Sequence, residues 1–223
     1  MLIPKLKMPG RLRAEDVPQL MLTHGIAYHR VETLNWPEAF PYRPQMEVAL
    51  AHTGRYLLLH YRVSENCIRA VAEGDGGRVW EDSCCEVFLQ PRGMEEGSAP
   101  SPYYYNIECN CVGTLLVAAG EDRHDRRQAP ADVMKAVSRW SSLGNQPTPL
   151  TDGDASWHMA LVVPAETLFE SNLDDFSGQH MRGNVYKCGD CLTTPHFLSL
   201  FPIRTENPDF HRPEFFQEFL FEG

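Results

Sequence analysis

VWEDSCCEVFLQ (79–90) and YYYNIECNCVGTLLVAA (103–119) are the two parts of the stretch that decides the fold. Successive side chains of an extended chain point to opposite faces of a sheet. The first part therefore divides into a mixed face and an apolar face. The two faces consist of Asp82, Cys84, Glu86, Phe88 and Gln90 on one side, and Cys85, Val87 and Leu89 on the other.

The second part is typical of a β-hairpin. Its first arm divides into an apolar face, Tyr103, Tyr105, Ile107, Cys109 and Cys111, and a polar face, Tyr104, Asn106, Glu108 and Asn110. Gly113 supplies the turn, and residues 114–119 are too apolar to face water. Asn and Glu side chains are costly to bury without partners. We therefore expect the polar face to lie against solvent or a polar ligand.

Alternation of this kind recurs along the chain, and turn signals separate short strands at intervals of about 10–20 residues. With 43% hydrophobic residues in a chain of 223, a full core is available. We predict an all-β fold, an antiparallel two-sheet β-sandwich of the immunoglobulin or jelly-roll kind, with short helical turns and long loops. Residues 27–223 form this sandwich, and residues 1–26 form an N-terminal arm packed on it. The residues expected between the sheets are Leu57, Leu59, Tyr61, Val87, Leu89, Ile107, Met159 and Leu161.

Several segments receive more specific predictions. Residues 133–140 and 157–163 are expected to be strands, joined by an irregular linker over 141–156. The charged run within 120–130 is interpreted as a solvated loop. Proline at the start of 164–169 predicts a single helical turn.

Charge excludes two classes of partner. The net charge is −10 and the isoelectric point is about 5.3. Nucleic acid and anionic membrane surfaces attract basic patches, so neither is expected as a partner. The opening MLIPKLKMPGRLR has no apolar stretch of signal-peptide length, which predicts a cytoplasmic protein.

The seven cysteines are an odd number, which does not close a disulfide framework. Cys67, Cys85, Cys109 and Cys111 fall on the predicted inward faces, where cysteine behaves as a small hydrophobe. We predict seven reduced thiols. Thiol titration of the denatured protein without reductant should then return close to seven equivalents.

Five motifs resemble the family 9 carbohydrate-binding modules, β-sandwiches related in shape to the DOMON domains. In chain order these are Trp80-x-Asp82-Ser83-x-x-Glu86-Val87-Phe88 with the turn Asn110-x-x-Gly113, Trp157-His-Met-Ala-Leu-Val-Val-Pro164, Asn184-Val-Tyr-Lys187, and Asn207-Pro-Asp-Phe210-His-Arg-Pro213-Glu-Phe-Phe216. Together they span roughly residues 40–222. The resemblance implies a saccharide ligand and no catalysis, in a role accessory to polysaccharide breakdown.

The resemblance also implies the site residues. The family holds a terminal sugar between two aromatic side chains, whose positions match Trp80 and Phe210. Glu86 and Asn207 match polar contacts to the sugar. Phe210 stands where the family has a tryptophan, and Glu108 stands where it has an arginine that contacts the sugar. These five residues are the predicted substrate-binding set, with no catalytic residue and no metal ligand among them.

The residues themselves support part of this hypothesis. Sugar binding needs flat aromatic faces ringed by polar groups. Trp80 follows the glycine-rich run 73–77, where an exposed platform is expected. We predict that Trp80 and Phe210 face each other across an open cleft with Glu86, Glu108 and Asn207 on its polar wall. The alternative is that Trp80 plugs the end of the core and Glu86 pairs with an arginine.

Other functions remain open at this point. A haem-binding DOMON-like domain would use Met46, Met159, His60 and His158 as candidate axial ligands. A glycoside hydrolase would use a carboxylate pair such as Glu81 and Glu86. No cofactor is expected, although Asp75, Glu81, Asp82 and Glu86 offer the oxygens that a structural calcium ion needs. Cys188-Gly-Asp-Cys191 has the spacing of a zinc or redox pair, and the simpler interpretation is structural thiols.

Overall fold

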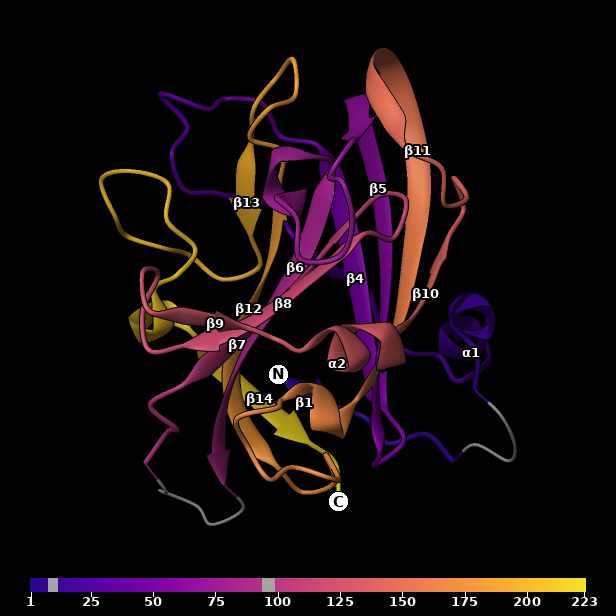
Figure 1. Ribbon diagram of the computed structural model, residues 1–223, viewed down its shortest axis with the longest axis vertical. Coiled ribbons are helices and arrows are strands. Elements are labelled where there is room, and N and C mark those ends of the chain that lie inside the picture. Colours follow the sequence, from indigo (N-terminus) through magenta and orange to yellow (C-terminus); the bar gives the residue numbers. More distant parts are fainter. Residues whose placement is uncertain (8–11, 94–98) are drawn as a thin grey trace.

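The computed structural model describes residues 1–7, 12–93 and 99–223, and it consists of two sheets packed face to face (Figure 1). The larger sheet runs in the order β1 (Leu2–Ile3), β14 (Gln217–Phe221), β12 (His180–Cys188), β6 (Cys84–Gly93), β7 (Tyr104–Asn110), β8 (Leu115–Gly120) and β9 (Arg126–Gln128). Two short strands extend it beside β12, namely β13 (Phe197–Ser199) and β3 (Thr33–Leu34). The smaller sheet runs in the order β10 (Ser138–Ser141), β11 (Thr148–Pro164), β5 (Tyr56–Ala70), β4 (Gln45–His52) and β2 (His29–Arg30).

Helical structure is confined to short pieces in the described part of the chain. These are α1 (Val17–Thr23), α2 (Ala131–Ala136), and the single 3₁₀ turns η1 (Ala14–Asp16), η2 (Val79–Glu81), η3 (Ala165–Thr167) and η4 (Pro213–Phe215). Among the strands of the described residues, every pair is antiparallel except β1 with β14. The predicted all-β sandwich is confirmed. No helix in the described residues is long and apolar enough to cross a membrane.

The main core lies between the sheets. Every residue predicted there is completely buried, so the inward face read from the alternating pattern is confirmed: Leu57, Leu59, Tyr61, Val87, Leu89, Ile107, Met159 and Leu161. Burial of each large apolar side chain stabilises the fold by about 1.5–3 kcal/mol. All seven cysteines are free thiols, and Cys191 is exposed whereas the others are buried.

A second apolar cluster covers the other face of the large sheet. We call it the outer cluster, and its buried members are Trp36, Val79, Cys84, Phe88, Tyr104, Leu116, Tyr186, Cys188, Ile203, Phe210 and Phe216. The strands contribute side chains from the face opposite to the main core, and the segment 203–216 lies over them. The large sheet is therefore buried on both faces.

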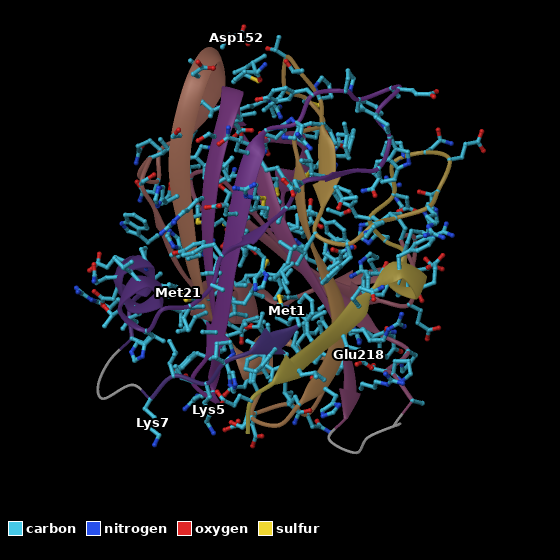
Figure 2. The ribbon with its side chains drawn as sticks, turned by 180° about the vertical axis from the view of Figure 1, so that it is seen from behind. Met1, Lys5, Lys7, Met21, Asp152 and Glu218 are labelled. Atoms are coloured by element: carbon cyan, nitrogen blue, oxygen red, sulfur yellow. The ribbon has the colours of Figure 1, made fainter. Side chains whose placement is uncertain are left out.

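The N-terminal residues contact both sheets. β1 joins the edge of the large sheet, and α1 packs against the outer face of the small sheet through Val17 and Met21. Figure 2 shows Met21 beside these strands, and Asp152 at the tip of β11, at the opposite end of the molecule from Lys5 and Lys7. In Figure 1 the two chain ends lie near each other, at the end where β1 meets β14.

Three sequence predictions about elements are wrong. Residues 133–140 are not one strand, because α2 occupies the first part and β10 the second. The linker 141–156 is half strand, because β11 begins at Thr148 and pairs with β5. The charged loop ends in β9, which pairs with β8. The helical turn after Pro164 is confirmed as η3.

Candidate functional site

A cleft of about 520 Å³ opens on the outer face of the large sheet. Its floor comes from β6, β7, β8 and β12, and its rim from η2, the turn into β9 and the segment 208–211. The lining residues are Gly76, Arg78, Trp80, Glu86, Asn106, Glu108, Leu116, Ala118, Arg123, Arg126, Gln128, Cys188, Asp190, Phe197, Pro208, Asp209, Phe210 and His211. The volume is in the range of small-molecule sites.

Trp80 sits on η2, directly before the strand that forms the floor. The 3₁₀ turn ends at Asp82, where the chain becomes extended, so Trp80 and Glu86 reach the same cleft although they are six residues apart. The Trp80 ring is half-buried, and the Arg78 guanidinium lies 5.7 Å from its centre. The carbonyl oxygen of Trp80 accepts a hydrogen bond from the backbone N–H of Asp190 at 3.1 Å. This contact joins the rim to the end of β12.

Asp82 anchors that turn. Its carboxylate accepts hydrogen bonds from Arg69 at 2.9 Å, from Asn110 at 2.9 Å, and from the backbone N–H groups of Val71 and Ala72. The Asp82 side chain is completely buried, and these donors stabilise its negative charge in the absence of solvent. Asp82 holds the turn that presents Trp80 and does not line the cleft.

Phe210 contributes an aromatic edge from the opposite wall. Its ring stacks on Tyr186 with centres 4.1 Å apart and planes 7° apart, and it contacts Trp36 and Phe197. Phe210 is only 8% exposed. The expectation of an open platform at this position is therefore wrong, because the ring belongs to the outer cluster and shows a small part of its surface to the cleft.

Two carboxylates lie side by side on the floor. Glu86 on β6 and Glu108 on β7 are directly opposite in the register, and both are at most 3% exposed. Burial raises the pKa of Glu108 to about 7, and burial together with the charge of Glu108 raises the pKa of Glu86 well above its usual range. Cys188 Sγ lies 2.9 Å from Glu86 Oε1, and Asn106 donates to Glu108 Oε1 at 2.7 Å.

Arg126 brings a cation to these acids. Its guanidinium lies 4.3 Å from the centre of the Tyr104 ring and donates to Asn106 Oδ1, which joins it to Glu108 through the Asn106 side chain. Burial lowers the pKa of Arg126 from its ordinary value. Two buried atoms here have no hydrogen-bond partner among the described residues, Arg126 Nε and Glu108 Oε2.

The rim has charge of both signs. Arg123 lies 3.7 Å from Asp209, and the Asp209 carboxylate accepts the backbone N–H of His211 at 3.0 Å. Burial lowers the pKa of His211 to about 3, so its ring is neutral and can share a proton with the Tyr104 hydroxyl at 3.0 Å. Burial and then the charge of Glu81 raise the pKa of Asp190 to about 6.

The structure brings together most of the predicted site residues. Trp80, Glu86, Glu108 and Phe210 all line the cleft. Asn207 is exposed and lies outside the lining, whereas the next residue, Pro208, belongs to it. The polar face of β7, expected against solvent or a polar ligand, is buried and includes Asn106 and Glu108 on the cleft floor.

Sequence reasoning missed the polar residues that β9 contributes to the site. Arg126 and Gln128 line the cleft from β9, a strand that had been interpreted as part of a solvated loop. Their spacing of two is compatible with a strand, but the same charged run is typical of a solvated loop, and pairing with β8 decides between the two. No local sequence pattern indicates that Asp190 and His211 line the cleft, because their positions depend on the packing of distant segments.

The candidate residues for haem binding, glycoside hydrolysis and calcium binding do not come together in the structure. Met46 and Met159 point into the main core, whereas His60 and His158 contact each other on the opposite face of the small sheet. Glu81 pairs with Arg78 and lies outside the cleft lining, so it does not face Glu86 there. The carboxylates Asp75 and Asp82 pair with different arginines, Arg139 and Arg69.

Comparison with known families agrees with this geometry. The model of carbohydrate-binding family 9 matches residues 15–221, which is nearly the whole chain. The chain belongs to carbohydrate-binding family 9. No curated protein matches it.

Solved structures support the family 9 fold. A proposed carbohydrate-binding protein from Bacteroides uniformis ATCC 8492 is 42% identical, with a TM-score of 0.93 over 100% of this chain and 98% of that one. A family 9 module from Caldicellulosiruptor kristjanssonii in complex with glucose is 9% identical, with a TM-score of 0.57 over 100% and 95% of the two chains. The same source provides a complex with cellotriose, 10% identical, with a TM-score of 0.56 over 100% and 94%. At such low identity the latter two show a shared fold.

Proposed function

We propose that this family 9 protein binds the end of a saccharide in the cleft without turning it over, as an accessory to polysaccharide breakdown. The observation that carries the proposal is the composition of the cleft. Trp80 and Phe210 supply apolar aromatic surface, and Glu86, Glu108, Asn106 and Arg126 supply acceptors and donors on the floor. A pyranose has the matching apolar faces and peripheral hydroxyl groups.

The unpaired atoms under the floor support a hydroxyl-bearing ligand. Arg126 Nε is a donor and Glu108 Oε2 is an acceptor, and both lack a partner in the described part of the chain. An unsatisfied buried polar group costs about 1–3 kcal/mol. A sugar hydroxyl can donate and accept at once, so after a small rotation of these side chains it would satisfy both.

The ligand class is drawn from the relatives. The Caldicellulosiruptor kristjanssonii module was solved with glucose and with cellotriose. The first ligands to test on this protein are therefore the ends of neutral β-glucans, followed by other mono- and oligosaccharides. One stacked sugar and several hydrogen bonds of modest net strength predict a dissociation constant between about 1 mM and 1 μM.

Calorimetric titration with Trp80→Ala tests the proposal. We expect the variant to lose at least about fivefold in affinity, because stacking on an aromatic ring contributes of the order of 1 kcal/mol or more. Trp80 is half-buried, so the stability cost should stay below the roughly 3–5 kcal/mol of a fully buried tryptophan. Trp140→Ala is the matched control, since Trp140 is a partly buried tryptophan on β10 of the other sheet.

Three outcomes would contradict the proposal. One is unchanged saccharide affinity in Trp80→Ala across the panel. Another is turnover of a chromogenic glycoside by the purified protein, because a binding module should release every ligand unchanged. The third is a loss of affinity in Trp140→Ala as large as in Trp80→Ala, which would place the ligand elsewhere.

A further inference from the structure

The floor of the cleft holds a cluster of two cysteines with Glu86, one of the carboxylates proposed above to contact the saccharide. Cys84 on β6 is directly opposite Cys188 on β12 in the strand register, and Glu86 follows on the same face of β6. The sulfur atoms and a carboxylate oxygen of these three residues all lie within 4.8 Å of one another. Each side chain is at most 2% exposed.

We propose that Cys84, Cys188 and Glu86 form a binding site for a zinc ion. Two thiolates and one carboxylate are a donor set that suits Zn²⁺ in a tetrahedral arrangement. In such a site the ligand atoms lie about 3.5–3.8 Å apart, given metal–ligand bonds of about 2.0–2.3 Å. Atoms as far apart as 4.8 Å must approach by about 1.0–1.3 Å to reach that spacing, whereas Cys188 Sγ and Glu86 Oε1, which are 2.9 Å apart, must separate by about 0.6–0.9 Å.

The fourth position of the ion opens toward the cleft. Glu86 and Cys188 both line the cleft, so a water molecule can reach the ion from that side. Glu108 lies opposite Glu86 on β7, and its Oε2 is buried with no hydrogen-bond partner in the described residues. An unpaired carboxylate oxygen in this place is compatible with a cation at the cluster, as it is with the sugar hydroxyl proposed above. Three protein ligands with one open position are the arrangement of zinc sites that keep an exchangeable ligand.

Only the first cysteine of the Cys188-Gly-Asp-Cys191 motif belongs to the proposed site. Cys188 is buried at the cluster, whereas Cys191 is exposed and its backbone N–H is bonded to Glu81. The partner of Cys188 is therefore a cysteine more than a hundred positions earlier in the chain, brought next to it by strand pairing. The thiols bind as thiolates, so loading with zinc displaces their protons to solvent.

Equilibrium dialysis of the reduced, chelator-treated full chain against Zn²⁺ tests the site. We expect close to one zinc per chain in the wild type, measured by elemental analysis. Cys84→Ser and Cys188→Ser should each weaken zinc binding at least about tenfold. Cys191→Ser is the matched control, because it makes the same change in the same motif, and it should retain one equivalent.

Cobalt substitution of the wild type keeps the test decisive if a variant fails to fold. Bound Co²⁺ should show thiolate-to-cobalt charge-transfer absorption in the near ultraviolet, and Zn²⁺ should displace it. Folded, reduced wild type that binds no zinc, or cobalt that gives no thiolate band, would overturn the proposal, as would equal losses in Cys191→Ser and Cys188→Ser. None of these measurements uses a saccharide, so the result is independent of the proposed function.

Discussion

Lys187 carries a charged amine into the space between the two sheets. Its Nζ is completely buried and lies 2.9 Å from Glu65 on β5 of the opposite sheet, 2.9 Å from His196 and 2.9 Å from the carbonyl oxygen of Cys188. Burial alone would lower the pKa of Lys187, but the charge of Glu65 outweighs it and raises the pKa. Trp157 Nε1 donates to the other oxygen of Glu65 at 2.7 Å.

Removing this amine should be costly. Lys187→Met leaves the Glu65 carboxylate buried without its cation, so we expect a loss of about 3–5 kcal/mol in the free energy of unfolding, measured in urea. Adding Glu65→Gln removes the stranded charge and keeps an acceptor for Trp157, so the double variant should recover part of the loss. Arg55→Met, which breaks an exposed ion pair with Glu166, should cost less than about 1 kcal/mol. A loss of that small size in Lys187→Met would contradict the network.

His60 predicts a pH dependence of stability. Its Nδ1 is 2.6 Å from the Tyr28 hydroxyl and its Nε2 is 3.2 Å from His158, and burial, then the charges of His158 and Arg62, lower its pKa to about 3. The unfolded chain takes up a proton at this residue below pH of about 6.5, whereas the folded chain does so only near 3. The contribution of His60 is therefore complete above about 6.5 and is lost as the pH falls toward 3.

Comparison with His60→Gln isolates this contribution from the other titrating groups. The stability of the wild type relative to the variant should fall by about 1.4 kcal/mol per pH unit below about 6.5. Chemical unfolding of both proteins at pH 7.5 and pH 5 should therefore give a difference that changes by about 2 kcal/mol between the two conditions. An unchanged difference would show that His60 titrates alike in the folded and unfolded states.

At the scale of elements, the turn η2 depends on Asp82 rather than on its own residues. Asp82→Ala leaves Arg69 without its buried partner and frees two backbone N–H groups. We expect a loss of roughly 3–5 kcal/mol in thermal or urea unfolding. Glu81→Ala, the adjacent change, removes an ion pair with the exposed Arg78 and should cost about 1 kcal/mol or less. Equal effects of the two changes would refute this role of Asp82.

Alternation of apolar and polar residues with a period of two correctly predicted the strands that bury one face in the main core. β5, β6, β7 and β11 all show it, and the inward residues predicted on them are buried in the main core. The same rule failed for α2, because a helix of six residues has too few positions to display a helical period. It failed for β9 because the charged residues of a cleft resemble those of a solvated loop. Local pattern does not distinguish the two, since pairing with β8 decides.

At the scale of the whole molecule, the sandwich can be predicted from local sequence patterns, whereas the cleft depends on contacts between distant segments. The sheets follow from local alternation, whereas the cleft needs the segment 203–216 folded over the outer face. The sequence predicted Trp80, Glu86, Glu108 and Phe210 as one group through their family resemblance, and the structure places all four in the cleft lining. Spacing alone did not reveal that Phe210 would be buried by Tyr186 and Trp36, because those contacts join distant parts of the chain.

The outer cluster is covered by the segment 203–216, which is held less firmly than the strands that enclose the main core. The segment over it is held by contacts such as Ile203 to Asn35, Phe210 to Tyr186 and Thr205 to Trp36, not by a strand ladder. Local opening of such a segment requires less free energy than global unfolding. Amide hydrogens of residues 203–212 should therefore exchange with deuterium sooner than those of β5 and β11, and a bound ligand should slow them selectively. We therefore expect the cover to open locally while the sandwich beneath it stays folded.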